Sequence, residues 1–224
     1  MRHVLITGSA GGIGQALVRK FQAEGWKVIG VDIKQGIDIS ALYWETEIEW
    51  PEKLDALINN AAIQYNKSLL TTTYAEWEQV MAVNLRSAWD VARSCHGLLK
   101  AAKGSIVNIS SVHAFATLPN KGAYPVSKAG LVALTRSMAL EWAEDGIRCN
   151  CVLPGAIDTP LLRQNAQRRA PLGRVGSPRE VAEIVYFLAD NEKSSFITGA
   201  SFVIDGGVLS ALSSEAGREC GKND

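Results

Sequence analysis

Three residues whose side chains could move a proton together lie within a short stretch of the chain. Tyr124 and Lys128 are four residues apart, and Ser111 precedes the tyrosine by thirteen residues. In a helix, a spacing of four places the phenol and the ammonium on one face, about one turn apart. A free phenol has a pKa of about 10, and a neighbouring cation lowers that value. Together with a serine hydroxyl that holds a carbonyl oxygen, these side chains predict a proton-transfer site for an alcohol or a ketone.

The composition narrows the class of protein that carries this site. The chain has 224 residues, 23 of them basic and 23 acidic, and 47% of its residues are hydrophobic. This length suffices for one large α/β domain with its own core. The balanced charge argues against a nucleic-acid surface, no apolar run is long enough for a membrane-spanning helix, and the N-terminus lacks the pattern of a signal peptide. We therefore expect a cytoplasmic protein that binds neither nucleic acid nor membrane.

Short apolar runs alternate with helical patterns along the chain, which predicts βαβ units and a doubly wound parallel sheet in a single α/β domain. The predicted strands are Val4–Thr7, Lys27–Val31, Leu54–Asn59, Gly104–Ile109, Arg148–Leu153 and Ser201–Ile204. The predicted helices are Gly12–Glu24, Tyr74–Leu99, Lys121–Glu144 and Pro178–Ala189. Because proline is tolerated only in the first turn of a helix, Pro125 places the start of its helix near residues 121–124. We expect the domain to span residues 1–209 and the polar tail, residues 210–224, to be frayed.

One connection is too short for such a fold. Only five residues separate Asp32 from Asp38, whereas a parallel crossover that contains a helix needs about a dozen residues. We therefore expect the helix between the second and third strands to be deleted or abbreviated. Trp44 and Trp50 fall in this region and could cover the sheet edge that the missing helix leaves bare.

A glycine-rich segment, Thr7–Gly14, follows the first predicted strand and opens the first predicted helix. Glycines let the backbone approach a pyrophosphate, and a helix N-terminus offers free N–H groups and the positive end of its dipole. The spacing is GxxxGxG, and with its strand and helix it predicts a Rossmann-type dinucleotide site. The residues expected to contact the cofactor here are Gly8, Gly11, Gly12, Ile13 and Gly14.

Asp32 ends the second predicted strand, 18 residues after Gly14. A carboxylate at this place accepts hydrogen bonds from both ribose hydroxyls and repels a 2′-phosphate. The glycine loop contains no arginine, and Lys34 is the only cation nearby in the sequence. We therefore favour NAD over NADP as the cofactor and expect Asp38 near the adenine edge. The alternative for Asp32 is a cap at the end of its strand.

The motifs, in this order and at this spacing, resemble those of the short-chain dehydrogenase/reductase family from about Val4 to Gly207. The matching segments are Thr7–Gly14, Asn59–Ala62, Asn84, Ser111, Tyr124 with Lys128, and Pro154–Gly155. The resemblance implies a catalytic tetrad without a metal, formed by Asn84, Ser111, Tyr124 and Lys128. It also implies further cofactor contacts from Asn59, Ala61, Pro154, Gly155, Ile157 and Thr159.

The resemblance gives each member of the tetrad a role. Tyr124 would be the general acid in reduction and the general base in oxidation. Lys128 would hold the nicotinamide ribose and lower the pKa of the tyrosine, and Ser111 would orient the substrate oxygen. Asn84 would hold a water that links the lysine to solvent. We choose Ser111 over its neighbour Ser110 because of the thirteen-residue interval to the tyrosine.

The sequence therefore predicts an NAD-dependent oxidoreductase that interconverts a secondary alcohol and a ketone, both small molecules. The alternatives are a 3-oxoacyl thioester reductase that uses NADPH and a non-catalytic dinucleotide-binding sensor. The family resemblance implies a homotetramer or a homodimer. His113 is either a substrate contact or a loop residue, and the Arg-rich segment 163–169 is either a contact for an anionic substrate or a solvated loop.

Overall fold

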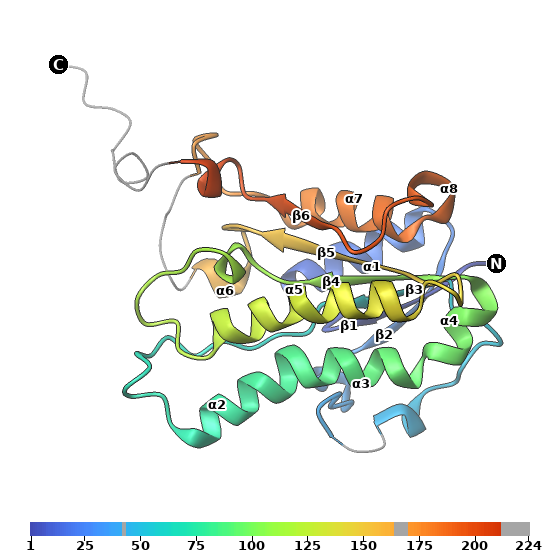
Figure 1. The fold of residues 1–224 in the computed structure, drawn as a ribbon, viewed down its shortest axis with the longest axis horizontal. Helices are drawn as coiled ribbons and strands as arrows, with labels where there is room; N and C mark the ends of the chain where they lie inside the picture. Colours follow the sequence, from blue (N-terminus) through green and yellow to red (C-terminus); the bar gives the residue numbers. More distant parts are fainter. Residues whose placement is uncertain (42–43, 164–169, 212–224) are drawn as a thin grey trace.

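A computed structural model describes residues 1–41, 44–163 and 170–211 of the chain. The described residues form one sheet of six parallel strands in the order β2-β1-β3-β4-β5-β6 (Figure 1). The strands are β1 (His3–Thr7), β2 (Lys27–Val31), β3 (Ala56–Asn59), β4 (Ser105–Ile109), β5 (Arg148–Pro154) and β6 (Ser201–Ile204). The predicted parallel sheet is confirmed, with strand ends shifted by two residues or fewer.

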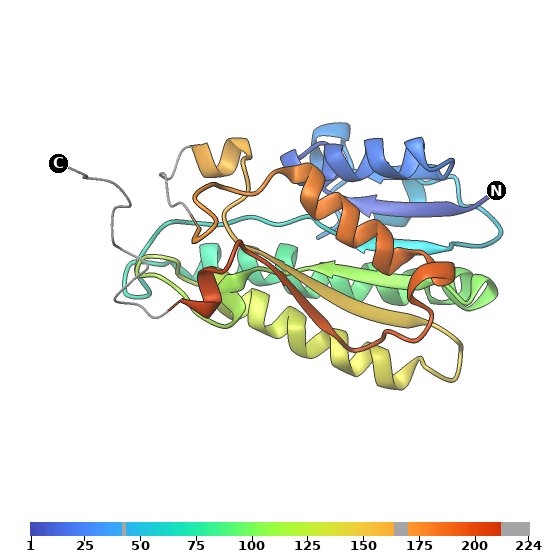
Figure 2. The ribbon, with the colours of Figure 1, turned by 90° about the horizontal axis from the view of Figure 1, so that it is seen from above.

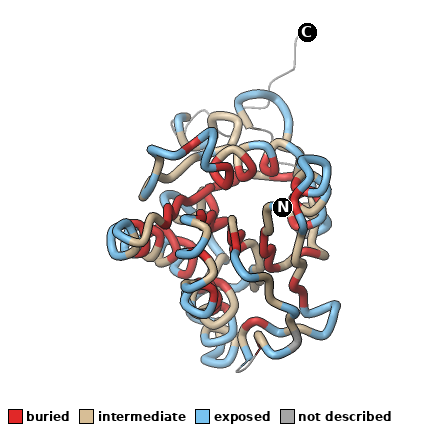
Figure 3. The backbone as a smooth tube through the Cα atoms, turned by 90° about the vertical axis from the view of Figure 1, so that its right-hand side faces the viewer, coloured by how far each residue is buried: buried red, intermediate tan, exposed pale blue. Residues whose placement is uncertain are grey.

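Helices cover both faces of the sheet, as a doubly wound fold requires. The α-helices are α1 (Gly12–Ala23), α2 (Tyr74–Met81), α3 (Ser87–Ser94), α4 (His96–Ala102), α5 (Tyr124–Glu141), α6 (Pro160–Arg163), α7 (Pro178–Ala189) and α8 (Asn191–Ser194). Figure 2 shows α1 and α7 on one side of the sheet and α5 on the other. Alternate strand residues follow this division, because Val4 and Ile6 pack towards α1 and α7 while Leu5 packs towards α3 and α5. The buried backbone lies between these layers (Figure 3).

Two predicted helices differ from the structure. The segment predicted as Tyr74–Leu99 is divided into α2, a π-helical turn over Ala82–Arg86, α3 and α4. The π turn coincides with Asn84, whose side chain bonds the backbone of Ile63 rather than facing solvent. The other helix, α5, begins at Tyr124 with Pro125 in its first turn, as predicted, but ends at Glu141 instead of Glu144.

The connection from β2 to β3 is abbreviated, as predicted. Its described residues contain two short 3-10 helices, Ile33–Gln35 and Trp44–Glu47, and no α-helix. In the common doubly wound order another strand lies outside the second one, whereas here β2 stands at the edge of the sheet. Trp44 and Trp50 contact each other edge to face, with ring centroids 6.0 Å apart, and they pack in one apolar cluster with Val31 at the end of β2. The loss thus includes a strand as well as the expected helix.

All strands run in the same direction, so their carboxyl ends meet at one edge of the sheet. Thr7 is in register with Val31, Asn59 with Asn108, and Ile109 with Val152. The loops that follow these residues carry most of the predicted site residues. No helix in the described part of the chain is long and apolar enough to cross a membrane.

Candidate active site

The glycine loop between β1 and α1 leaves no room for a side chain at its close-packed glycines Gly8 and Gly14. Gly8 has a φ of +64°, and a Cβ there would lie 2.8 Å from the Cα of Ala61. A Cβ on Gly14 would overlap the carbonyl oxygen of Gly8. The loop is closed by the Gly11 N–H, which donates to the Gly8 carbonyl at 3.1 Å. The first turn of α1 carries no acidic side chain, so the positive end of its dipole is available to an anion.

The Asp32 carboxylate joins the end of β2 to this loop. One oxygen accepts a hydrogen bond from the Ala10 N–H and the other from the Lys34 N–H, both at 2.9 Å. Asp32 therefore caps the short 3-10 helix Ile33–Gln35 that follows β2, beside the glycine loop. Asp38 is exposed and accepts hydrogen bonds from the N–H and hydroxyl of Ser40 in its own turn.

Thr7 and Asn60 connect the ends of β1 and β3 by hydrogen bonds, and neither role was predicted from the sequence. The Thr7 hydroxyl accepts hydrogen bonds from the N–H groups of Asn60 and Ala61 at 3.0 and 3.1 Å. The Asn60 amide donates to the carbonyls of Thr7 and Gly8. The Asn59 side chain points elsewhere, donating to Asn108 at 2.9 Å inside the core. The sequence features that could have indicated these roles are the threonine directly before Gly8 and the pair Asn59-Asn60.

Ser111, Tyr124 and Lys128 come together at the carboxyl ends of β4 and β5. Tyr124 is the first residue of α5 and Lys128 follows one turn later, with Nζ 5.8 Å from the centre of the tyrosine ring. The Ser111 side chain lies close enough to the Tyr124 side chain to lower the pKa of the phenol. Ser110 is engaged differently, since its hydroxyl donates to the Lys128 carbonyl at 2.8 Å. The geometry therefore brings Ser111, and not Ser110, to the tyrosine hydroxyl.

Burial is the largest influence on the pKa values of Tyr124 and Lys128. It raises the pKa of Tyr124, and the nearby Ser111 side chain lowers that pKa by a smaller amount. Lys128 is 2% exposed, and burial lowers its pKa to about 8. Its Nζ donates to the Ile109 carbonyl at 2.7 Å. The expected lowering of the tyrosine pKa by Lys128 is not found, because desolvation of the phenolate is the larger effect.

Asn84 contacts α5 at the residue next to Lys128. Its side-chain oxygen accepts from the Ile63 N–H at 2.8 Å, and its amide donates to the Ile63 carbonyl at 2.9 Å and to the Ser127 hydroxyl at 3.1 Å. Asn84 thus ties the loop after β3 to the residue preceding Lys128. These contacts hold the α5 face that carries the lysine.

The loop after β5 approaches the start of α1. Pro154 ends β5, and the Gly155 N–H donates to the Ile204 carbonyl of β6 at 2.9 Å. Ile157 is buried in the core cluster that contains α1. Thr159 lies so close to Gly12 that a Cβ there would meet its Cγ2 at 2.8 Å. The residues predicted to contact the two ends of a dinucleotide therefore line one edge of the sheet.

Comparisons with known proteins agree with this geometry. A family model described as enoyl-(acyl carrier protein) reductase matches residues 29–209. An uncharacterized oxidoreductase of Thermotoga maritima is 34% identical, with 91% of this chain and 94% of the relative covered. A 3-oxoacyl-[acyl-carrier-protein] reductase of the same organism is 36% identical, covering 92% and 96%. The solved structure of 4-hydroxyisoleucine dehydrogenase complexed with NADH matches with a TM-score of 0.85 and 30% identity, over 95% of this chain and 100% of that one.

The chain belongs to the short-chain dehydrogenase/reductase family. It is therefore an oxidoreductase with a Rossmann-type fold, as the sequence resemblance implied.

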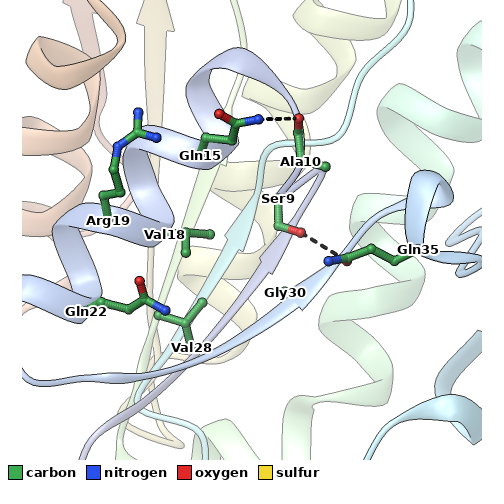
Figure 4. A pocket seen from close by; sticks show the side chains of 9 residues that line it. All are labelled: Ser9, Ala10, Gln15, Val18, Arg19, Gln22, Val28, Gly30 and Gln35. Carbon is green, nitrogen blue, oxygen red and sulfur yellow. Dashed lines mark hydrogen bonds between the residues drawn. The ribbon is translucent and has the colours of Figure 1, made fainter.

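This short-chain dehydrogenase/reductase has a shallow hollow between α1 and the edge strand β2 (Figure 4). Its volume is about 360 Å³, and its lining includes Ser9, Arg19, Val28 and Gln35. Figure 4 shows the Ser9 hydroxyl directed at the Gln35 side chain, a contact of 3.4 Å. The hollow borders the glycine loop and was not predicted from the sequence.

Two predictions fall outside the described residues. They concern Arg168 and Arg169 of the Arg-rich segment and residues 212–224 of the polar tail.

Proposed function

We propose that the protein is an NAD(H)-dependent oxidoreductase that interconverts a secondary alcohol and a ketone, with Tyr124 as general acid and base. The observation that carries this proposal is the placement of Ser111 and Tyr124 next to each other, beside the buried ammonium of Lys128. This pair lies at the sheet edge that also carries the glycine loop and Asp32. Bound NAD would supply the hydride acceptor, and the protein would supply position and proton transfer.

The residues at the sheet edge fit a dinucleotide. The tight loop and the free first turn of α1 suit a pyrophosphate, which we assign to Gly8, Gly11, Gly12, Ile13 and Gly14. Asp32 would accept hydrogen bonds from the adenosine ribose, with Asp38, Asn59 and Ala61 on the same side. Pro154, Gly155, Ile157 and Thr159 would contact the nicotinamide end.

The reaction follows from the charges at the site. During oxidation Tyr124 accepts the proton of the alcohol, and during reduction it returns a proton to the carbonyl oxygen. Ser111 donates a hydrogen bond to that oxygen, where negative charge develops. Lys128 would bind the nicotinamide ribose, and its ammonium favours the phenolate that accepts the proton in oxidation and is left after proton transfer in reduction. Asn84 keeps α5 and the loop after β3 in place and would hold a water that connects the lysine to solvent.

The NADPH-dependent 3-oxoacyl thioester reductase is the second candidate. A relative with that activity in its name is 36% identical to this chain, which favours it. The Asp32 carboxylate opposes it, because its charge would lie against a 2′-phosphate. A non-catalytic dinucleotide sensor is a weaker candidate, since this chain keeps both the tyrosine and the lysine.

We further propose a cytoplasmic homotetramer or homodimer whose catalytic domain spans residues 1–209. Large apolar side chains on α3 and α5 support association, because Trp89, Val126 and Leu140 are 45%, 45% and 80% exposed. Helices with such faces pair readily between subunits.

A substrate panel tests the proposed activity. Secondary alcohols with NAD and ketones with NADH are screened by the change in NADH absorbance, and each active pair is repeated with NADP or NADPH. We expect turnover with the non-phosphorylated cofactor and at least tenfold weaker use of its phosphate, about 1.4 kcal/mol of discrimination. Strict use of NADPH would favour the thioester reductase, and binding of NADH without turnover on any substrate would favour the sensor.

A further inference from the structure

Two side chains beside Tyr124 have no part in the proposed proton transfer. His113 lies two residues after Ser111, and its ring packs edge to face against the Tyr124 ring with centroids 5.9 Å apart. Lys121 lies three residues before the tyrosine, and its carbonyl accepts the Tyr124 N–H at 3.2 Å. Both side chains are half-buried. Both residues therefore lie near the N-terminal end of α5, where Tyr124 begins the helix.

The Lys121 ammonium is held by a neutral group. Its Nζ donates to the side-chain oxygen of Asn66 at 3.0 Å, and the Gln64 amide donates to that same oxygen. Among the described residues, no carboxylate lies within ion-pair distance of this lysine. The nearby Lys67 is different, since it pairs with Glu76 at 2.6 Å. A partly desolvated ammonium without a counter-charge is costly, and a bound anion would offset that cost.

His113 adds a neutral donor next to this charge. Its burial and the neighbouring Lys121 lower the pKa of the imidazole, which favours the uncharged form at neutral pH. The Nδ1 atom lies 3.0 Å from the Thr117 hydroxyl, which can donate here in place of its longer contact of 3.5 Å with the Leu118 carbonyl. In that tautomer the other ring nitrogen carries the proton, and it has no partner within the described part of the chain. One cation and one neutral N–H group suit the single charge of a carboxylate.

We propose that Lys121 and His113 form a carboxylate subsite, and that the substrate is a hydroxy acid or the matching oxo acid. The inference rests on the proposed function, because it assigns the alcohol or carbonyl oxygen of the same molecule to Ser111 and Tyr124. The edge-to-face contact of His113 with Tyr124 keeps the two subsites adjacent. The carboxylate and the reacting carbon are therefore separated by a short chain, and a long neutral substrate such as a sterol would leave the Lys121 charge unpaired.

Kinetics with acids and their methyl esters test this specificity. In the wild type, we expect turnover of a short hydroxy or oxo acid, with the ester a poorer substrate. Replacing Lys121 by methionine should raise KM for the acid by about 10–100-fold, the loss of one charge-assisted hydrogen bond, with a small change in kcat. Lys121→Arg should restore most of the affinity. Lys67→Met, which removes a neighbouring charge that is already paired, is the matched control and should change KM less than threefold, or about 0.6 kcal/mol.

A binding measurement separates this inference from the proposed function. Glycolate and propionate are titrated into the protein with and without NADH, and binding is followed by saturation-transfer NMR. Binding that is weakened in Lys121→Met but not in Lys67→Met supports the subsite even if no substrate is turned over. Equal binding to wild type and Lys121→Met would overturn the inference. So would a substrate panel in which neutral alcohols are preferred over acids, although that result would leave the proposed oxidoreductase activity intact.

Discussion

The two halves of the site are built on very different parts of the sheet. The catalytic half lies on β4 and β5, every residue of which is buried, and on α5 packed against them. The nucleotide half reaches out to β2, of whose residues Val31 alone is buried, at a sheet edge covered by loops and short 3-10 helices. The chain has lost a crossover at this edge while the central strands keep the full pattern. The buried strands are thus complete around the proposed proton-transfer site, and the sheet is shortened at the edge where the proposed cofactor contacts come from Asp32 and a loop.

The central half also contains a chain of buried polar contacts. Asn59 donates to Asn108, which donates to Thr135 at 2.9 Å, and Thr135 donates to the Leu131 carbonyl of α5. These bonds join β3 and β4 to the helix that carries Tyr124 and Lys128. Such a network is most stabilising when all its members are satisfied, and here the side-chain oxygen of Asn59 has no partner among the described residues. Substitutions in the catalytic half should therefore affect turnover, and substitutions in the nucleotide half should affect cofactor choice.

The largest effect is expected for Tyr124→Phe. Loss of the general acid should lower kcat by roughly 10²–10⁴-fold while the affinity for NADH stays unchanged. Tyr74→Phe is the matched control, since Tyr74 is 81% exposed on α2 and should have no effect. The measurement is steady-state turnover together with NADH fluorescence titration. Wild-type turnover in the Tyr124 variant would show that another group transfers the proton.

A second effect is a pH-dependent cost of burying Lys128. Burial lowers the pKa of this lysine from 10.5 to about 8, so between these values the unfolded chain binds more protons than the folded protein. The free energy of unfolding of the wild type should therefore rise with pH in this window relative to Lys128→Met. The expected gain is on the order of 3 kcal/mol, which urea unfolding at several pH values would measure. Parallel pH curves for the two proteins would contradict the lowered pKa.

The polar network makes a third prediction. Asn108→Ala removes a fully buried amide and leaves Asn59 and Thr135 without that partner, so it should lower the free energy of unfolding by about 2–3 kcal/mol. Because Asn108 neighbours the Lys128 contact at Ile109, kcat should fall as well. Urea unfolding and turnover are measured on the same preparation. A stable variant with full turnover would mean that the network does not position α5.

A change at the nucleotide half should alter cofactor choice and leave the chemistry intact. Asp32→Ser removes the charge that opposes a 2′-phosphate and should shift the ratio of NADPH to NADH use by about tenfold, or 1.4 kcal/mol. kcat with the preferred cofactor should change little. Glu49→Ser serves as the control, since Glu49 is an exposed carboxylate of the same connection with no assigned cofactor contact. An unchanged ratio would remove Asp32 from cofactor discrimination.

The smallest effect is expected at the covered edge. Trp44 is 4% exposed, and its indole N–H has no hydrogen-bond partner within the described residues. Trp44→Phe loses apolar contact and also removes that unsatisfied donor, so the free energy of unfolding should change by less than about 1 kcal/mol. Turnover should be unaffected. A large decrease in the free energy of unfolding would show that packing at the β2 edge contributes as much to stability as packing in the centre of the sheet.

Much of the fold could be predicted from the sequence, because alternating apolar runs and the glycine loop depend on local patterns. The start of α5 followed from Pro125 alone, and the short interval from Asp32 to Asp38 revealed the missing helix. The division of the helix around Asn84 could not be predicted, since it depends on a hydrogen bond to Ile63, 21 residues away. The prediction of a lowered Tyr124 pKa was wrong for a related reason. The four-residue spacing placed Lys128 near the tyrosine, but the burial that raises the pKa depends on tertiary packing. Lys121 was missed because its uncompensated charge is visible only in three dimensions.

The most direct measurement follows a labelled hydride. The protein is incubated with NADH that carries deuterium at the transferable position, together with a ketone or oxo acid found active in the substrate panel, and the product is examined by mass spectrometry. Our account predicts one deuterium on the carbinol carbon with the wild type and almost none with Tyr124→Phe. A product without deuterium, or undiminished transfer by the tyrosine variant, would contradict the assignment of this site as an NAD-dependent hydride-transfer centre.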